Sequence, residues 1–172
     1  LLELRDLSLA RADGVPVYEQ VSFTMAPGEV LSIVGESGSG KTQLLLSLLG
    51  LAMPGSRHSG SARFLNEELV GATPGALQRL RGSRIAMLFQ DPMSALNPFL
   101  KIRQQMVEVL QVHRGTGRSE ALERAQQALA DVELPDPVRI LRQYPLELSG
   151  GMRQRVMLAM AVLAGPSLLL AD

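Results

Sequence analysis

The strongest limit on the fold is a glycine-rich stretch, GESGSGKT, at residues 35–42. A largely apolar run at 30–34 precedes it and a leucine-rich run at 44–49 follows it. Strand, glycine-rich turn and helix are therefore predicted in that order. This is the context that a phosphate-binding loop of the pattern G-x-x-x-x-G-K-[ST] requires. We predict an α/β fold in which a strand at 29–34 is buried on both faces.

The residue types of this loop suit a polyphosphate. Its glycines allow positive φ angles, so consecutive backbone N–H groups can approach an anion, and the positive end of the following helix points the same way. Lys41 can reach the β- and γ-phosphates, and the Thr42 hydroxyl can bind Mg²⁺. The alternative is a glycine-rich turn with a solvated lysine, which the strand and helix around it disfavour. The predicted nucleoside-triphosphate-binding residues are Gly35, Glu36, Ser37, Gly38, Ser39, Gly40, Lys41 and Thr42.

Composition excludes several other classes of protein. The 17 basic and 17 acidic residues cancel, so the basic excess typical of non-specific nucleic-acid binders is missing. The sequence has no cysteine, which rules out disulfides and thiolate metal sites and fits a reducing compartment. The longest apolar run, 156–170, is interrupted by Gly165 and Pro166 and is too short to span a bilayer. We expect a single soluble domain, and a fragment of a longer protein because Asp172 directly follows an apolar run.

The remaining pattern predicts an antiparallel start that leads into a parallel core. Strands are predicted at 2–9, 15–25, 61–65, 85–89 and 168–172, and a short helix at 73–80. Helical spacing recurs at 102–110, at 119–132 with Ser119 as N-cap, and at 148–163, where the helix is apolar nearly all round and therefore predicted to be buried. A small helical subdomain is thus expected between the strands of the core.

A second anion site is suggested at residues 148–155. Ser149 and two glycines at a helix start leave free N–H groups and a hydroxyl that point outward. Arg153 and Arg155 lie in the first turn, where the helix dipole disfavours cations unless an anion is near. The composition alone equally allows a flexible helix start whose arginines pair with Glu147 or solvent.

The stretch LSGGMRQR resembles the signature sequence of ABC-transporter ATPases, and Met152 in place of the commoner glutamine is typical of the peptide-importer branch. Gln90 resembles the Q-loop glutamine of that family, and residues 168–172 resemble its Walker B strand. The stretch QDPMSALNP at 90–98 is similar to the Q-loop of oligopeptide, dipeptide and nickel importers. The positions that match the signature are Leu148, Ser149, Gly150, Gly151, Gln154 and Arg155.

The resemblance implies a P-loop NTPase of the ABC type, with a RecA-like parallel core, an N-terminal antiparallel β part and an inserted helical subdomain. Residues 1–90 and 144–172 would form the β part and P-loop core, and 91–143 the Q-loop and helical subdomain. Thr42, Gln90 and Asp172 would organise Mg²⁺, and Gln90 and Asp172 would be the catalytic positions that the chain contains. The signature residues that would contact the ATP of a second protomer are Ser149, Gly150, Gly151 and Gln154.

The implied function is that of an ATP-binding and ATP-hydrolysing importer subunit for peptides or nickel, on the cytoplasmic face of the cell membrane. The implied partners are a second ATPase subunit, bound head-to-tail, and integral membrane permease subunits. The segment that would contact the permease subunits runs from Asp91 to Leu100. The alternatives are a soluble ABC-type ATPase acting on DNA or ribosomes, and a non-catalytic nucleotide-binding or dimerisation module. The chain lacks the long coiled-coil inserts and basic arms of the soluble machines.

Three parts of the family pattern are not matched. The hydrolytic glutamate follows the Walker B aspartate in the family, and the switch histidine lies further on, so we expect this chain to bind ATP without appreciable hydrolysis. A later strand of the family lies between the Walker A and Walker B strands, so we expect a gap or an unpaired edge at that place in the sheet. The adenine-stacking aromatic would fall near Ala12; Tyr18 is the only close candidate, and we expect it in packing instead.

Overall fold

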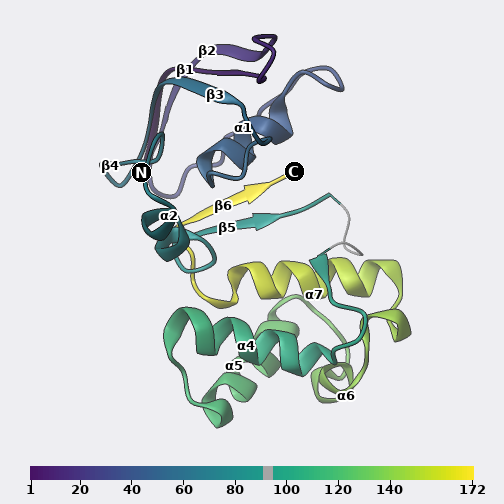
Figure 1. The fold of residues 1–172 in the computed structure, drawn as a ribbon. Coiled ribbons are helices and arrows are strands. Elements are labelled where there is room, and N and C mark those ends of the chain that lie inside the picture. The colour runs from purple at the N-terminus through teal and green to yellow at the C-terminus, as the bar shows by residue number, and fades with distance from the viewer. Residues whose placement is uncertain (91–94) are drawn as a thin grey trace. The chain divides into compact units, whose positions relative to one another are not determined.

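The computed structural model describes residues 1–90 and 95–172. The chain divides into two compact units, Leu1–Arg79 and Leu80–Asp172 (Figure 1). The first contains the antiparallel strands and the glycine-rich loop, and the second contains a pair of parallel strands and most of the helices.

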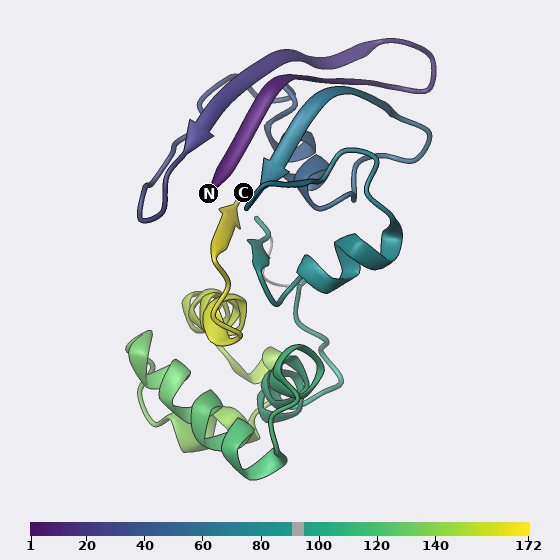
Figure 2. The ribbon, with the colours of Figure 1, turned by 90° about the vertical axis from the view of Figure 1, so that its left-hand side faces the viewer.

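The first unit is built on a four-stranded antiparallel sheet whose long strands run side by side in Figure 2. The strand order is β2-β1-β3-β4, so the N-terminal strand has neighbours on both edges. The strands predicted at 2–9, 15–25 and 61–65 are confirmed, although the third begins at Arg57. The bounds are β1 Leu2–Ala10, β2 Pro16–Met25, β3 Arg57–Phe64 and β4 Glu67–Glu68.

A β-bulge in β1 explains why its hydrophobic alternation is imperfect. Leu2, Leu4, Leu7 and Leu9 are all buried, although the spacing changes between the second and third of them. The pairing with both neighbouring strands shifts in the same part of the strand, where Asp6 has a positive φ of 48°. One extra residue at the bulge therefore keeps all four leucines on the core side.

Gly60 in β3 lies against this bulge. Its φ is +85°, and a Cβ at this position would lie 2.3 Å from the carbonyl oxygen of Asp6 and 2.6 Å from that of Arg5. Both atoms belong to the backbone, which cannot rotate out of the way as a flexible side chain can. The close approach of the two strands therefore requires glycine here.

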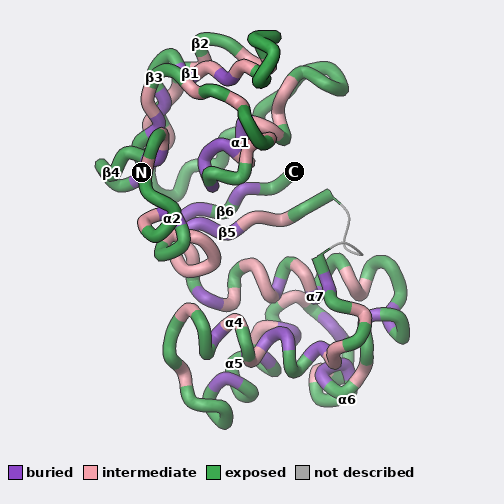
Figure 3. Tube along the Cα trace, viewed as in Figure 1, coloured by how far each residue is buried: buried purple, intermediate pink, exposed green. Residues whose placement is uncertain are grey.

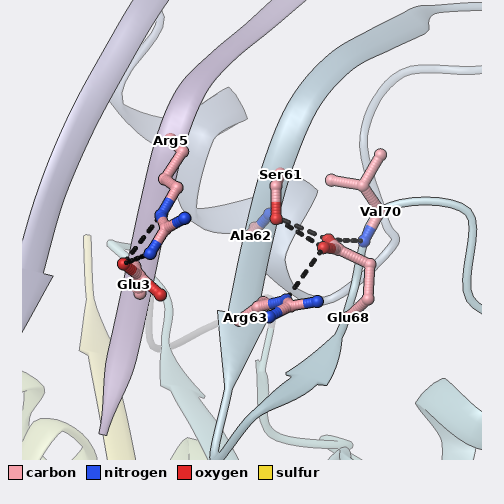
Figure 4. Close-up of polar contacts among 7 residues, drawn as sticks. All are labelled: Glu3, Arg5, Ser61, Ala62, Arg63, Glu68 and Val70. Atoms are coloured by element: carbon pink, nitrogen blue, oxygen red, sulfur yellow. Dashed lines mark hydrogen bonds and ion pairs between the residues drawn. The ribbon is translucent and has the colours of Figure 1, made fainter.

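The hairpin of β3 and β4 is held by the carboxylate of Glu68 (Figure 4). It accepts hydrogen bonds from the Ser61 hydroxyl and from the backbone N–H groups of Ala62 and Val70, at 2.5, 2.8 and 3.1 Å. Nε of Arg63 lies 3.7 Å from one carboxylate oxygen. Partial burial raises the pKa of Glu68, but these hydrogen bonds and the guanidinium together bring it below its usual value.

The prediction of a buried strand at 29–34 is wrong. These residues form no strand, and the side chains of Val30 and Val34 are 91% and 92% exposed. A strand exists only where a neighbour completes its hydrogen-bond ladder, and no segment within the described part of the chain pairs with this one. The gap or unpaired edge expected beside this strand stays a prediction, because the strand that would border it does not form.

The second unit contains two parallel strands, β5 Ile85–Leu88 and β6 Leu168–Ala171. They confirm the strands predicted at 85–89 and 168–172, each in shortened form. Residues alternate between buried and exposed along β6, with Leu168 and Leu170 buried and Leu169 39% exposed. Only one face of β6 is therefore covered.

The helices of the second unit enclose an apolar core, as the purple stretches of Figure 3 show. They confirm the predicted helical region, but α5 begins at Arg118 with Gly117 as its N-cap, so the N-cap assigned to Ser119 is wrong. The helices are α4 Ile102–Arg114, α5 Arg118–Asp131, α6 Pro137–Arg142 and α7 Gly150–Leu163, with a 3₁₀ turn η1 Pro145–Glu147. Core residues include Leu96, Ile102, Met106, Ala125, Leu129, Leu134, Ile140, Leu141, Leu148, Val156 and Ala159.

Helix α7 is buried on one side only, contrary to expectation. Val156 and Ala159 are fully buried, whereas Leu158 and Val162 are 38% and 42% exposed. Helices α4 and α5 and strand β5 contact α7, and these contacts cover the first face but not the second. Across residues 1–90 and 95–172, no helix has the length and apolar content that a membrane crossing requires.

Candidate functional site

The glycine-rich loop of the first unit has the predicted positive φ angles at two of its three glycines, but not at Gly35. Gly38 and Gly40 have φ angles of +81° and +90°, a region that glycine adopts without the steric cost a side chain would add. Helix α1, Lys41–Leu48, begins directly after Gly40, and the first helical hydrogen bond runs from Leu44 N–H to the Gly40 carbonyl at 2.8 Å. The positive end of α1 therefore lies at the loop.

The ammonium group of Lys41 lies within the curve of this loop. It donates hydrogen bonds to the carbonyl oxygens of Gly35 and Glu36 at 2.7 and 2.6 Å, and to Oγ of Ser39 at 3.3 Å. The loop thus gathers the N–H groups of a helix start and a cation in one place. Phosphate oxygens are stronger acceptors for an ammonium than neutral carbonyls are. A phosphate at this loop can therefore replace the contacts that Lys41 makes to the backbone.

Strand β2 supports the loop and α1 from one side. A Cβ on Gly40 would lie 2.8 Å from the carbonyl oxygen of Val17. The Tyr18 hydroxyl donates to Oγ of Ser47 at 2.8 Å, and this oxygen donates to the Gln43 carbonyl at 2.7 Å. Burial raises the pKa of Tyr18, although the hydrogen bond with Ser47 acts in the opposite direction. Tyr18 therefore joins β2 to α1, in agreement with the packing role expected for it.

A hollow of about 420 Å³ lies between β2, residues 31–35 and α1. Val21, Phe23, Leu31 and Leu44 contribute to its largely apolar lining, and Lys41 lies at its border. Apolar walls offer few partners for a phosphate, so the anion-binding groups are those of the loop rather than those of the hollow. The hollow is the space beside the segment at 29–34 that was expected to form a strand.

In the second unit, Gln90 and Asp172 follow the carboxyl ends of β5 and β6. The two strands are parallel with Leu88 opposite Ala171, and the N–H of Asp172 donates to the Leu88 carbonyl at 3.1 Å. The structure therefore brings Gln90 and Asp172 to the same edge of this strand pair, the edge at which parallel sheets bind ligands. Within residues 1–90 and 95–172, no group of three or more His, Asp or Glu residues is arranged to hold a metal by itself.

Helix α7 begins as predicted. Ser149 is its N-cap, and its hydroxyl oxygen accepts a hydrogen bond from Met152 N–H at 3.3 Å. Gly150 and Gly151 are exposed, and no atom lies within 4 Å of a Cβ built on either of them. Gln154 is exposed one turn further on. This helix start leaves an open approach to its first backbone N–H groups.

The two arginines of this helix do not face that opening. Nη1 of Arg155 donates to the carbonyl oxygens of Glu133 and Val132, at 2.9 and 3.2 Å. Nη1 of Arg153 donates to the carbonyl of Pro145 at 3.5 Å. The structure therefore favours a packing role for both: they donate to backbone carbonyls, and Nη1 of Arg155 also lies 4.0 Å from a carboxylate oxygen of Glu133 rather than of Glu147. The argument for an anion from their charge is not supported.

The predicted site residues thus fall into two groups. Residues 35–42 lie in the first unit, while Gln90, Asp172 and the start of α7 lie in the second. Their assignment to ATP and Mg²⁺ stays a prediction. The proposed permease contact at 91–100 is only partly visible, because 91–94 lie outside the described residues. Within the rest of it, Leu96 is buried in the core and Phe99 is 85% exposed.

Comparison with known proteins gives a consistent picture. A family described as "ABC transporter" matches residues 18–172. The oligopeptide transport ATP-binding protein OppD of Salmonella typhimurium is 45% identical over all of this chain and 52% of its own length. A putative peptide import ATP-binding protein of Brucella melitensis is 46% identical over all of this chain and 53% of its own length. The chain therefore spans about half the length of these relatives.

Solved structures agree with the fold. The ATP-binding cassette MJ0796, in a dimeric post-hydrolysis state bound to ADP and Pi, is 28% identical with a TM-score of 0.86, over all of this chain and 73% of its own. The cbiO1 protein of Clostridium perfringens, part of the transporter complex cbiONQ, is 25% identical with a TM-score of 0.78, over 99% of this chain and 64% of its own. The α/β fold with an antiparallel part and a helical part is confirmed.

Proposed function

Because the chain belongs to the ABC transporter family, we propose that it is the nucleotide-binding part of a subunit that couples ATP binding and hydrolysis to peptide import. The observation that carries the proposal is the position of Lys41, whose ammonium lies inside the curve of a glycine loop at the start of α1. The names of the relatives favour peptides over nickel as the cargo.

ATP binding would begin with an exchange of partners at Lys41. The ammonium leaves the carbonyl oxygens of Gly35 and Glu36 and turns to the phosphates, while the N–H groups of residues 35–42 surround them. The Thr42 hydroxyl, the Gln90 amide and the Asp172 carboxylate offer the hard oxygen ligands that Mg²⁺ prefers. Bound Mg²⁺ would neutralise part of the phosphate charge.

A second protomer would complete the site. The open helix start at Ser149, Gly150 and Gly151, with Gln154 one turn on, would contact the ATP held by the loop of the opposite subunit, which accords with the dimeric state of a structural neighbour. Two sites then form between two head-to-tail protomers. The exposed Phe99 supports the proposal that residues 91–100 contact membrane subunits on the cytoplasmic side.

The chain offers a matched test because it has only two lysines, Lys41 and Lys101. Lys101 belongs to the second unit, where its ammonium lies 5.4 Å from the centre of the Tyr144 ring. Lys41→Ala and Lys101→Ala remove the same charge, so titration with a fluorescent ATP analogue compares position alone. We expect at least a tenfold loss of affinity for the first and less than a twofold change for the second. Equal affinities would refute the nucleotide site.

Coupling to transport is tested in the intact protein together with its membrane subunits in vesicles. We expect ATP hydrolysis that rises when an oligopeptide is added, and that stops with Lys41→Ala. A rate of ATP hydrolysis that does not change with added peptides of any length would contradict peptide import. It would not contradict the proposed nucleotide site.

A further inference from the structure

The side chain of Arg114 joins three segments of the second unit. Arg114 is the last residue of α4, and its Nε donates to the Ala164 carbonyl at 2.6 Å. Its Nη2 also donates to this oxygen, to the Gly165 carbonyl at 3.1 Å and to the Ser83 carbonyl at 3.5 Å. One guanidinium therefore connects the end of α4, the end of α7 and the turn before β5.

The chemistry of this contact suits arginine. The last carbonyls of a helix have no partner within the helix and carry the negative end of its dipole. Ala164 and Gly165 are such residues at the end of α7, and Gly165 has a positive φ of 62°. A guanidinium offers several donors in a planar fork, together with a permanent charge. A lysine at this position would keep the positive charge but would lack the planar set of N–H donors.

A second contact beside Arg114 limits how α4 can move. The ring of His113 packs on Gly82, where a Cβ would lie 2.3 Å from Nε2. Gly82 and Ser83 belong to the turn that leads into β5, and the carbonyl of Arg84 accepts hydrogen bonds from the N–H groups of Ser167 and Leu168. The end of α4 is therefore fixed to the same short segments that begin β5 and β6.

Helix α7 links the Arg114 contact at its C-terminal end to the proposed signature site at its N-terminal end. It has Ser149 at its start and Ala164 at its end, and a helix of this length is a rigid rod of roughly 20 Å. Only residues 165–167 separate its end from β6, the strand that leads to Asp172. The position of the rod relative to β6 thus depends on how residues 164 and 165 are held.

We propose that Arg114 is a positioning residue, which fixes the end of α7 against the turn before β5 and so sets where Ser149 and its glycines lie relative to Gln90 and Asp172. This inference rests on the proposed function, since it matters for catalysis only if the start of α7 contacts nucleotide. Arg114 touches no proposed nucleotide ligand itself. Its loss should therefore change turnover without changing the affinity of the loop at 35–42.

The test uses the intact protein with Arg114→Ala, Arg114→Lys and Arg103→Ala. Arg103 is an exposed residue of the same helix, so its replacement removes the same charge. We expect Arg114→Ala to lower kcat at least tenfold with a change below twofold in the affinity for a fluorescent ATP analogue. Arg114→Lys should recover part of kcat, and Arg103→Ala should behave as wild type. Thermal melting shows that each variant is folded.

Wild-type kcat in Arg114→Ala, or an equal loss of kcat and nucleotide affinity, would overturn the inference. Amide hydrogen exchange without nucleotide provides a readout that does not depend on hydrolysis. We expect faster exchange in Arg114→Ala at residues 161–165, at the end of α7 that the guanidinium contacts, and unchanged exchange there would also overturn it. A wild-type protein that hydrolyses no ATP would instead refute the proposed function, and the exchange result would still decide whether Arg114 holds the helix.

Discussion

Substitution of Gly40 or Gly38 by alanine adds one methyl group to the glycine-rich loop and so tests the proposed nucleotide site. Both have positive φ angles in the loop, but they differ in the space around them. No atom lies within 4 Å of a Cβ on Gly38, whereas a Cβ on Gly40 would lie 2.8 Å from the Val17 carbonyl oxygen and 3.2 Å from its Cγ1. Gly38→Ala therefore meets only backbone strain, and Gly40→Ala meets strain and a clash with β2.

The expected magnitudes follow from these two terms. A left-handed conformation costs a residue with a side chain about 1–2 kcal/mol, and overpacking against fixed atoms adds about 1–3 kcal/mol. If the loop must hold its shape to bind phosphate, each 1.4 kcal/mol weakens binding about tenfold. Gly38→Ala should then weaken ATP binding roughly 5- to 30-fold, and Gly40→Ala roughly 30- to 4,000-fold.

The assay is titration of the folded chain with a fluorescent ATP analogue, after thermal melting has set a temperature at which every variant is native. Gly14→Ala is the control, because Gly14 has a φ of +85° and open space around it but lies in the β1–β2 turn. We expect wild-type affinity for this variant. The reasoning is refuted if Gly40→Ala binds within threefold of Gly38→Ala, or if Gly14→Ala loses as much affinity as Gly38→Ala.

Three further predictions concern stability, measured by urea denaturation. Gly60→Ala should lower the free energy of unfolding by about 2–5 kcal/mol because of its clash with the β1 backbone, and Gly71→Ala, with φ +73° and open space, by only about 1–2; similar losses in the two variants would contradict this account. Burial lowers the pKa of His58, whose Nε2 has no hydrogen-bond partner among the described residues. The unfolded chain therefore binds the proton more readily, so stability should be full above the ordinary pKa of 6.5 and fall as the pH drops below it. His58→Gln should flatten this part of the curve, and an unchanged slope would show that another group titrates. The pKa of Glu68 lies below its usual 4.5, so its stabilising effect should be present above pH 4.5 and be lost as the pH falls through the lower folded value. Glu68→Gln should reduce the pH dependence in that range, and a curve parallel to wild type would argue against the hydrogen-bonded carboxylate.

Local sequence signals predicted the local parts of the site. The glycine pattern gave the positive φ angles at Gly38 and Gly40 and the helix start at Lys41. The serine–glycine pattern at 149–151 predicted a helix start, and α7 begins at Gly150. These features depend on residues within one turn of each other, which is why their sequence spacing is informative.

Features that depend on distant partners were not predictable in this way. The segment at 29–34 has the composition of a buried strand, but a strand also needs a neighbour, which the segment's own sequence cannot supply. The partners of Arg155 are carbonyls 22 and 23 residues away in the chain. The contact of Arg114 with the end of α7 spans 50 residues and left no spacing to detect. Non-local packing decided each of these cases.

The exposed segment at 29–34 has a practical consequence for work with the protein. Val30 and Val34 are almost fully exposed beside Leu31 and Ile33. No strand among the described residues forms backbone hydrogen bonds of a sheet with this segment. Short apolar stretches of this kind seed aggregates, because copies of the chain can pair through them. Yield and storage life of the 172-residue chain should therefore depend steeply on protein concentration. A charged residue placed at the exposed Val30 should extend both.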